Sequence, residues 1–204
     1  MDKHNELQAV LTNKKKVLII GPNGAGKSTF AAKLGTCYDF EVCHLDKLFW
    51  QENWNAVTKD EFEKKVNEMM CSEKPYIIDG DYFFNLEKRL EHADLVIWIK
   101  IPLLVCVANI IKRRFKYAMN TRPDITEGCD EKLSLSFLMY ALRYNKRSGK
   151  QTKELLDNVY EKELFIIDSY RKLNTYGIRI FAGLSVCWLF AIICITSYNI
   201  YYVN

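Results

Sequence analysis

The sequence contains few of the residues that most often interrupt regular structure. Its 204 residues include only four prolines and nine glycines. Hydrophobic residues make up 49% and charged residues 26%, so the chain is neither mainly disordered nor fibrous and has enough apolar material for a core. This length and composition predict one α/β domain with a small appendage.

A cysteine framework is also missing. The seven cysteines form no CxxC pair and no Cys/His cluster, and their number is odd. A disulfide scaffold or a zinc site is therefore not expected, and the cysteine usage fits a reducing cytosol. Residues 1–15 are polar and Lys-rich and lack the apolar core of a signal peptide. We expect them to form a polar N-terminal extension of a cytoplasmic domain.

Charge is absent from the C-terminal tail. No residue from 180 to 203 is charged, and most of this segment is apolar. A membrane span needs about 20 such residues, and basic residues precede this one. We therefore predict a C-terminal hydrophobic helix over residues 178–204 that anchors the cytoplasmic domain to a membrane through residues 180–200. An additional core helix and an accidental extension are the alternatives.

Short apolar runs alternate with helical patterns along residues 16–175. Strands are expected at residues 16–20, 40–45, 76–79, 95–99 and 164–167. Helices are expected at residues 28–34, from a capping box at Thr58 to Pro75, and at residues 102–114, 133–144 and 152–160. The alternation predicts a P-loop NTPase domain with three αβα layers and a five-stranded parallel sheet. We expect Gly35 to end the first helix, and residues 115–148 to form a helical lid that includes a loop at 115–131.

A phosphate-binding motif follows the first expected strand. The loop and its flank consist of Gly21, Pro22, Asn23, Gly24, Ala25, Gly26, Lys27, Ser28 and Thr29, and they match the pattern GxxxxGK[ST] between a strand and a helix. The glycines let the backbone wrap a phosphate, and the helix N-terminus adds N–H donors. Lys27 is expected to reach the β- and γ-phosphates of ATP, and Ser28 to bind Mg²⁺. A chance match on a tight turn is the alternative.

Two aspartates follow expected strands. Asp79 ends the strand at 76–79, where a carboxylate would hold Mg²⁺ through water, although a turn-forming aspartate before Gly80 is the alternative. Asp46 follows the strand at 40–45 and is expected either to contact the hydroxyl of an acceptor or to cap a helix. We expect His44 to be structural.

Basic residues are concentrated in one segment. Residues 112–150 contain ten basic and four acidic residues, a net charge of +6 in a chain whose total is +4. Arginine suits bidentate phosphate contacts and stabilises a phosphoryl group in transfer. Arginines bracket the lid-like loop at Arg113, Arg114, Arg122, Arg143 and Arg147. A solvated basic face is the alternative for any one of them. Arg89 is expected to form a surface ion pair, and contact with a substrate phosphate is its alternative.

Two classes of P-loop protein find no support. The string at residues 21–29 is common in ABC-type ATPases, but no LSGGQ-like signature follows it and no glutamate follows Asp79. A GTPase would need NKxD and DxxG strings downstream of the loop, and the sequence has neither. Small-molecule and nucleotide kinases remain, since they combine a short P-loop core with a basic lid.

Over residues 16–174 the chain resembles the small P-loop kinases known as DNA topology modulation proteins, which are relatives of adenylate kinase. The matching strings lie at residues 21–29, 44–50, 77–82, 89–90, 93–94, 112–114, 121–124 and 127–129. The resemblance implies an adenylate-kinase-like core in which Asp79 matches the strand-end acid and Arg113, Arg114 and Arg122 match lid-side basic residues. The acceptor that it implies is a nucleoside monophosphate. Asp81 departs from the asparagine usual in the family, and the apolar tail has no counterpart there.

The residues together predict a phosphotransferase that uses ATP and Mg²⁺. Lys27 and Ser28 hold the donor, Asp79 orients the metal, Asp46 contacts the acceptor, and Arg113, Arg114 and Arg122 stabilise the phosphoryl group. A rival from another class is a nucleotide-gated DNA-binding or regulatory P-loop ATPase whose basic segment contacts nucleic acid. The sequence has no helix-turn-helix signature to support it.

Overall fold

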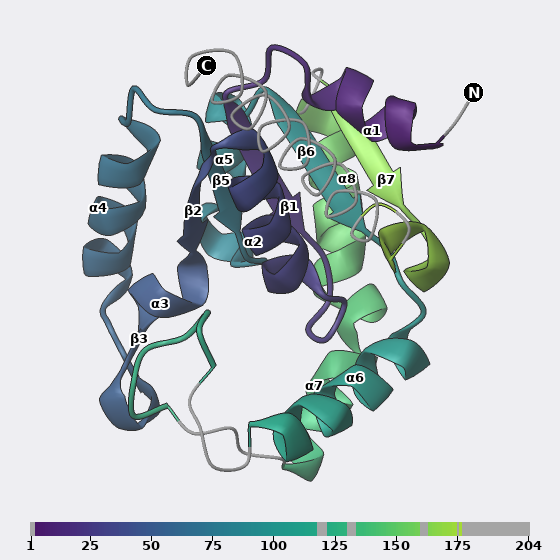
Figure 1. Cartoon of the computed structure of the whole chain (residues 1–204). Helices are drawn as coiled ribbons and strands as arrows, with labels where there is room; N and C mark the ends of the chain where they lie inside the picture. Colours follow the sequence, from purple (N-terminus) through teal and green to yellow (C-terminus); the bar gives the residue numbers. More distant parts are fainter. Residues whose placement is uncertain (1–2, 118–121, 130–133, 160–162, 175, 177–204) are drawn as a thin grey trace, which may run out of the picture.

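The computed structural model of the chain describes residues 3–117, 122–129, 134–159, 163–174 and 176 (Figure 1). Its centre is a parallel sheet with the strand order β2-β5-β1-β6-β7. The strands are β1 (Lys16–Ile20), β2 (Glu41–His44), β5 (Tyr76–Asp79), β6 (Leu95–Ile99) and β7 (Glu163–Ile167). All five predicted strands are confirmed to within one residue at each end. Parallel neighbours require crossover connections, so helices cover the sheet.

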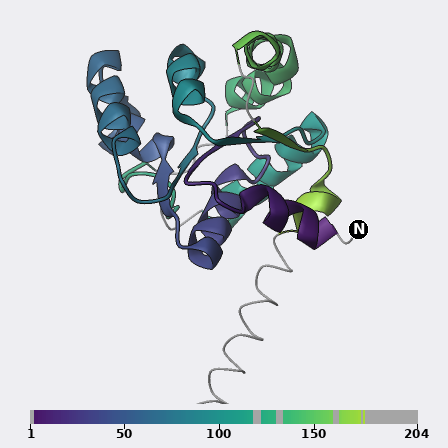
Figure 2. The same ribbon diagram turned by 90° about the horizontal axis from the view of Figure 1, so that it is seen from above.

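Alternate residues of each strand support two separate parts of the core. Val17 and Ile19 point into a cluster with helices α1 (Lys3–Leu11) and α2 (Lys27–Tyr38). Leu18 and Ile20 point into a cluster with α4 (Lys59–Met70), α5 (Leu86–His92) and α8 (Ser148–Val159). Figure 2 shows the same arrangement, with α4, α5 and α8 above the sheet and α1 and α2 below it. Because both faces are covered, the central strands β1, β5 and β6 are apolar along most of their length. The predicted three-layer α/β architecture is therefore confirmed.

Helices and short elements connect these strands. The α-helices are α1 (Lys3–Leu11), α2 (Lys27–Tyr38), α3 (Leu45–Phe49), α4 (Lys59–Met70), α5 (Leu86–His92), α6 (Leu103–Lys116), α7 (Leu135–Leu142) and α8 (Ser148–Val159). The other elements are the hairpin of β3 (Trp50–Gln51) and β4 (Asn55–Ala56) and the 3₁₀ turns η1 (Glu52–Trp54), η2 (Phe83–Asn85) and η3 (Tyr144–Lys146).

Two helix boundaries differ from the sequence-based expectations. Helix α2 continues through Gly35 and ends at Asp39, which adopts a left-handed conformation (φ 56°). Gly35 is needed for packing instead, because a Cβ there would lie 2.3 Å from the Val42 side chain. Helix α4 begins as predicted, with the Thr58 hydroxyl accepting a hydrogen bond from the Glu61 N–H, but it ends at Met70, well before Pro75.

The N-terminal residues contribute to the core. Residues 1–15 were expected to be a polar extension, yet they include α1, whose Leu7 and Leu11 are buried against the sheet. Most residues of this helix are polar, so its composition did not indicate that two of its leucines would be buried. Helices α3 and α5 and the β3–β4 hairpin were not predicted either, since each is too short for a clear period.

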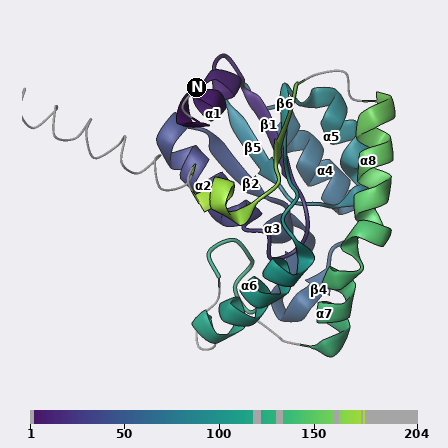
Figure 3. The same cartoon turned by 90° about the vertical axis from the view of Figure 1, so that its right-hand side faces the viewer.

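Helices α6 and α7 pack together beyond the carboxyl ends of the strands (Figures 1 and 3). Helix α7 lies within the region predicted as a helical lid, residues 115–148, whereas α6 precedes it and extends two residues into the predicted loop at 115–131. We call the described residues of the range 103–148, which includes α6 and α7, the lid. Within the described part of the chain, every helix is too short or too polar to cross a membrane. The predicted transmembrane segment, residues 178–204, lies outside the described residues and stays a prediction.

Candidate active site

The phosphate loop lies between the central strand β1 and helix α2. Gly26 precedes α2 in a left-handed conformation (φ 90°) and contributes no capping side chain, so the first N–H groups of the helix face the loop. Lys27 folds back over the loop, and its Nζ donates a hydrogen bond to the carbonyl oxygen of Pro22 at 3.1 Å. The loop therefore presents backbone donors and one ammonium group to an anion.

Gly24 holds this loop against the lid helix α6. Its φ is +80°, and a Cβ at this position would lie 2.3 Å from the carbonyl oxygen of Cys106 and 2.9 Å from the side chain of Ile110. Gly26 has a similar φ of +90°, but a Cβ there would meet only Leu173, at 3.2 Å. A side chain at either position would force a left-handed backbone, but only one at Gly24 would also collide with α6. Comparing substitutions at the two positions therefore isolates the free-energy cost of that collision.

We expect Gly24→Ala to destabilise the fold more than Gly26→Ala, by about 1–3 kcal/mol, the usual cost of overpacking. The left-handed backbone costs each variant about 1–2 kcal/mol, so the difference reports the contact with α6. Urea denaturation of both variants measures it. Equal losses would show that α6 moves away from the loop without cost.

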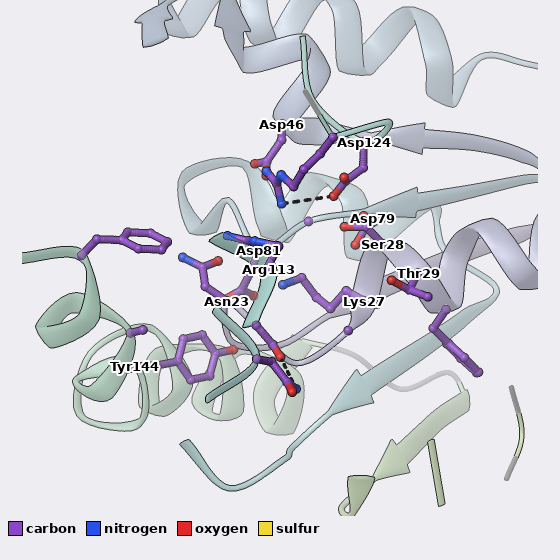
Figure 4. A pocket seen from close by; sticks show the side chains of 18 of the residues that line it. Asn23, Lys27, Ser28, Thr29, Asp46, Asp79, Asp81, Arg113, Asp124 and Tyr144 are labelled. Atoms are coloured by element: carbon purple, nitrogen blue, oxygen red, sulfur yellow. Dashed lines mark hydrogen bonds and ion pairs between the residues drawn. The ribbon is translucent and has the colours of Figure 1, made fainter. Parts of the chain in front are cut away.

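The carboxylate of Asp79 lies at the end of β5, as predicted, and is buried. His44, its partner in the register of the neighbouring strand β2, donates from Nδ1 to Asp79 Oδ2 at 2.8 Å. The other oxygen, Oδ1, is buried and has no hydrogen-bond partner among the described residues. Figure 4 shows Asp79 and Ser28 in the same part of the cavity. A carboxylate with one unsatisfied oxygen near the Ser28 hydroxyl fits a hydrated Mg²⁺ ion.

Asp81 is a second carboxylate close to Lys27, and it was given no role from the sequence. Burial raises its pKa, while the opposing charges of Lys27 and Arg89 lower it less. The Tyr144 hydroxyl faces it, and burial together with the Asp81 charge raises the pKa of Tyr144 (Figure 4). Burial thus disfavours the charged form of Asp81, and the nearby Lys27 favours it.

Asp46 is held at the mouth of the cavity by groups from two other segments. It lies at the second position of α3, and the Tyr82 hydroxyl donates to its Oδ1 at 2.8 Å. Arg122 Nη2 lies 3.9 Å from Asp46 Oδ2, and Arg122 Nη1 lies 3.4 Å from Asp124 Oδ2. The Asp46 side chain remains 43% exposed, so it can contact a ligand. Helix capping, the alternative reading, does not occur, since His44 is the N-cap of α3.

Asp124 connects the Asp46–Arg122 pair to Ser28 of the phosphate loop. Burial would raise its pKa, but Arg122 and a hydrogen bond from Ser28 outweigh burial and hold the pKa below its ordinary value. Asp124 is therefore ionised and compensates the charge of Arg122.

Arg89 differs most from its expected role. It was expected to form a surface ion pair, yet it is only 1% exposed. Its guanidinium donates to the carbonyl oxygens of Gly80 and Tyr82 at 3.0 and 2.6 Å and to Asn85 Oδ1 at 2.7 Å. It fixes the segment that directly follows Asp79 at the end of β5 and carries Asp81 and Tyr82.

One cavity of about 1290 Å³ joins these groups. Its lining includes the phosphate loop from Asn23 to Thr29 except the buried Ala25, and the four aspartates Asp46, Asp79, Asp81 and Asp124. The lid contributes Lys112, Arg113, Lys116, Arg122 and Arg147. Two predicted lid residues, Arg114 and Arg143, are not among the residues that line it. Single-ligand pockets are typically about 300–1,000 Å³, so this cavity has room for two substrates.

Aromatic side chains line the part of the cavity near Asp46, and the sequence analysis missed them. They are Phe49, Trp50, Trp54, Tyr82, Phe83 and Phe84. Their rings contact one another, for example Phe49 and Tyr82 with centroids 4.9 Å apart. The cluster of aromatics at residues 49–54 and 82–84 was the available signal, but apolar residues more often fill a core than line a site.

Solved structures resemble this fold. A gluconokinase from Sinorhizobium meliloti is 17% identical, with a TM-score of 0.51 over 84% of this chain and 92% of that one. A deoxyadenosine kinase from M. mycoides, with products dCMP and a flexible dCDP bound, is 18% identical, with a TM-score of 0.47 over 84% and 98%. An uncharacterized protein from Eubacterium ventriosum is 15% identical, with a TM-score of 0.45 over 85% and 99%.

No family model matches the chain, and no curated protein does. None of these comparisons confirms the resemblance to the DNA topology modulation proteins. At such low identity the likeness concerns the fold alone. This chain therefore shares its fold with the gluconokinase.

Proposed function

We propose that the protein is a kinase that transfers the γ-phosphate of ATP to a small acceptor bound beside Asp46. The observation that carries this proposal is the shared cavity: the phosphate loop, Asp79 and Asp46 all line it. A nucleotide on the loop would direct its γ-phosphate toward the space next to Asp46. A phosphate-binding loop alone serves many activities, but a second compartment with a carboxylate is what an acceptor needs.

In this arrangement the N–H groups of the loop and Lys27 bind the β- and γ-phosphates. Ser28 and Asp79 would hold Mg²⁺, which, when bound, neutralises charge on the phosphates. Among the residues that the structure describes, no three His, Cys, Asp or Glu side chains gather into a metal site. That fits an ion bound largely through the nucleotide. Arg113 and Arg122, which line the cavity, would stabilise the phosphoryl group in transfer.

The rival function, DNA binding through the basic segment, would require these cations on an open surface. Five of the ten basic residues line the cavity: Lys112, Arg113, Lys116, Arg122 and Arg147. Arg147 also lies over the ring of Tyr140, with 3.7 Å between the guanidinium carbon and the ring centroid. Among the five, Arg113 and Arg122 are not exposed, so these two arginines favour a ligand inside the cavity over a flat nucleic-acid surface.

The direct test uses ATP labelled at the γ-phosphate, with Mg²⁺ and a panel of sugars, sugar acids, nucleosides and nucleoside monophosphates. We expect label to appear on at least one acceptor, and to be lost with Lys27→Ala. ATP binding is measured separately by calorimetry. If ATP binds and no acceptor is labelled, the protein is not a small-molecule kinase.

A further inference from the structure

The two sides of the cavity differ in charge. We call the cavity-lining residues between positions 46 and 84 the acceptor wall: Asp46, Phe49, Trp50, Trp54, Asp79, Gly80, Asp81, Tyr82, Phe83 and Phe84. This wall holds three carboxylates and six aromatic rings and not one cation. All residues from 46 to 84 are described, so the wall contains no hidden lysine or arginine.

The cations that line the cavity in the described residues come from other segments. Lys27 belongs to the phosphate loop and Lys33 to α2, and the remaining five lie in the lid. Lys27 donates to the Pro22 carbonyl oxygen and lies close to Asp81 of the acceptor wall. Arg122 contacts the wall through Asp46, and its charge is compensated by Asp46 and Asp124.

Two further cations lie near the acceptor wall but do not line the cavity. Arg89 is only 1% exposed, and its guanidinium donates to the carbonyl oxygens of Gly80 and Tyr82 and to Asn85. Lys59 lies over the ring of Phe84, with Nζ 5.6 Å from the centroid. A phosphate group on an acceptor beside Asp46 would therefore meet that carboxylate, and the cation that contacts it, Arg122, is already paired with two carboxylates.

The aromatic rings indicate what the wall does bind. Trp50 and Trp54 meet edge to face with centroids 5.4 Å apart, and both line the cavity. Trp54 adopts a left-handed backbone conformation (φ 63°), which is an outlier for a bulky residue. Strain of this kind is characteristic of positions where a side chain serves a ligand. Flat faces of this type stack on planar rings.

On the basis of the proposed kinase activity, we infer that the acceptor is an uncharged alcohol with a planar heteroaromatic ring, such as a nucleoside, and not a nucleoside monophosphate. Asp46 takes the proton of the acceptor hydroxyl. The hydroxyl oxygen forms a bond to the γ-phosphorus, and the bond from that phosphorus to the β,γ-bridging oxygen breaks. The electron pair leaves with ADP, and the proton is released from Asp46 to solvent.

Matched acceptor pairs test this inference. Each of several nucleosides is compared with its own 5′-monophosphate under saturating Mg-ATP. We expect kcat/KM for the better nucleosides to exceed that of their monophosphates at least a hundredfold. Efficient phosphorylation of monophosphates but not of nucleosides would overturn the inference and leave the proposed kinase intact. If ATP binds and neither member of any pair reacts, the proposed function fails and the inference with it.

Asp46→Asn distinguishes attack by a hydroxyl from attack by the phosphate oxyanion of a monophosphate. A hydroxyl must lose its proton during attack, whereas a monophosphate attacks with an oxyanion that needs no base. We therefore expect the variant to lower kcat with a nucleoside roughly a hundredfold, the usual contribution of a general base, with a small change in KM. Unchanged kcat would show that Asp46 takes no proton.

Trp54→Gly tests the stacking without endangering the fold, because glycine adopts the left-handed conformation freely. We expect KM for the nucleoside to rise about tenfold with little change in kcat, as for loss of one stacking ring. Phe115→Ala is the matched control, since this ring is 76% exposed on α6 outside the cavity lining. Equal KM values for both variants would show that Trp54 does not bind the acceptor.

Discussion

Replacing Lys27 by alanine is expected to lower the rate of phosphoryl transfer about a thousandfold, the scale on which one preorganised charged donor acts. The Lys27 side chain lines the cavity, and its ammonium donates a hydrogen bond to the carbonyl oxygen of Pro22 in the same loop. When a nucleotide binds, that ammonium can turn to the phosphates over a short distance. The charge that develops between the β- and γ-phosphates during transfer is what it stabilises.

The same substitution should leave the fold almost unchanged. Lys27 donates to a loop carbonyl, and such a bond contributes only about 1 kcal/mol to the free energy of unfolding. Lys65→Ala is the control, because Lys65 lies on α4 in a surface ion pair with Glu61, with 2.7 Å between Nζ and Oε1. Rates come from the labelled-ATP assay and stabilities from urea denaturation. If Lys27→Ala retains more than a tenth of the rate, the loop does not position the γ-phosphate as we propose.

The central strands could be predicted because their signal is local. Strands covered on both faces are continuous apolar runs, and residues 16–20, 76–79 and 95–99 show this pattern without interruption. The phosphate loop was predicted for the same reason, since its whole motif lies within nine residues. Helix α1 could not be predicted in this way, because Leu7 and Leu11 are buried by tertiary contacts and the neighbouring sequence has no pattern that indicates them.

Within the candidate site, the sequence predicted which residues lie at strand ends, but it did not predict which side chains line the cavity. Asp79 and His44 are register partners at the carboxyl ends of neighbouring strands, so their proximity follows from the topology. The acceptor wall could not be predicted, because a ring that lines a cavity and a ring that fills a core have the same sequence pattern. The position of Arg89 was not predictable either, since only the structure shows that it is buried and does not line the cavity.

Replacing Arg89 by methionine is expected to destabilise the fold by about 3–5 kcal/mol, the usual cost of breaking a buried charged network. Burial lowers the pKa of Arg89 to about 10, so the side chain stays protonated at neutral pH. Methionine has a similar length but leaves the carbonyl oxygens of Gly80 and Tyr82 and the side chain of Asn85 without their donor. The opposing charge beside Asp81 is also lost.

Arg89→Lys separates the effect of the positive charge on stability from the effect of the guanidinium's planar hydrogen-bonding geometry. Lysine keeps the positive charge near Asp81, but an ammonium cannot replace the planar fork that reaches Gly80, Tyr82 and Asn85 together. We expect its loss of stability to fall between those of the wild type and the methionine variant, as measured by urea denaturation. Because this fork holds the segment that directly follows Asp79 and carries Tyr82, both variants should also bind Mg-ATP and the acceptor more weakly. A loss below about 1 kcal/mol for Arg89→Met would mean that the segment after β5 keeps its shape without the guanidinium, and that residues 80–85 are fixed by packing instead.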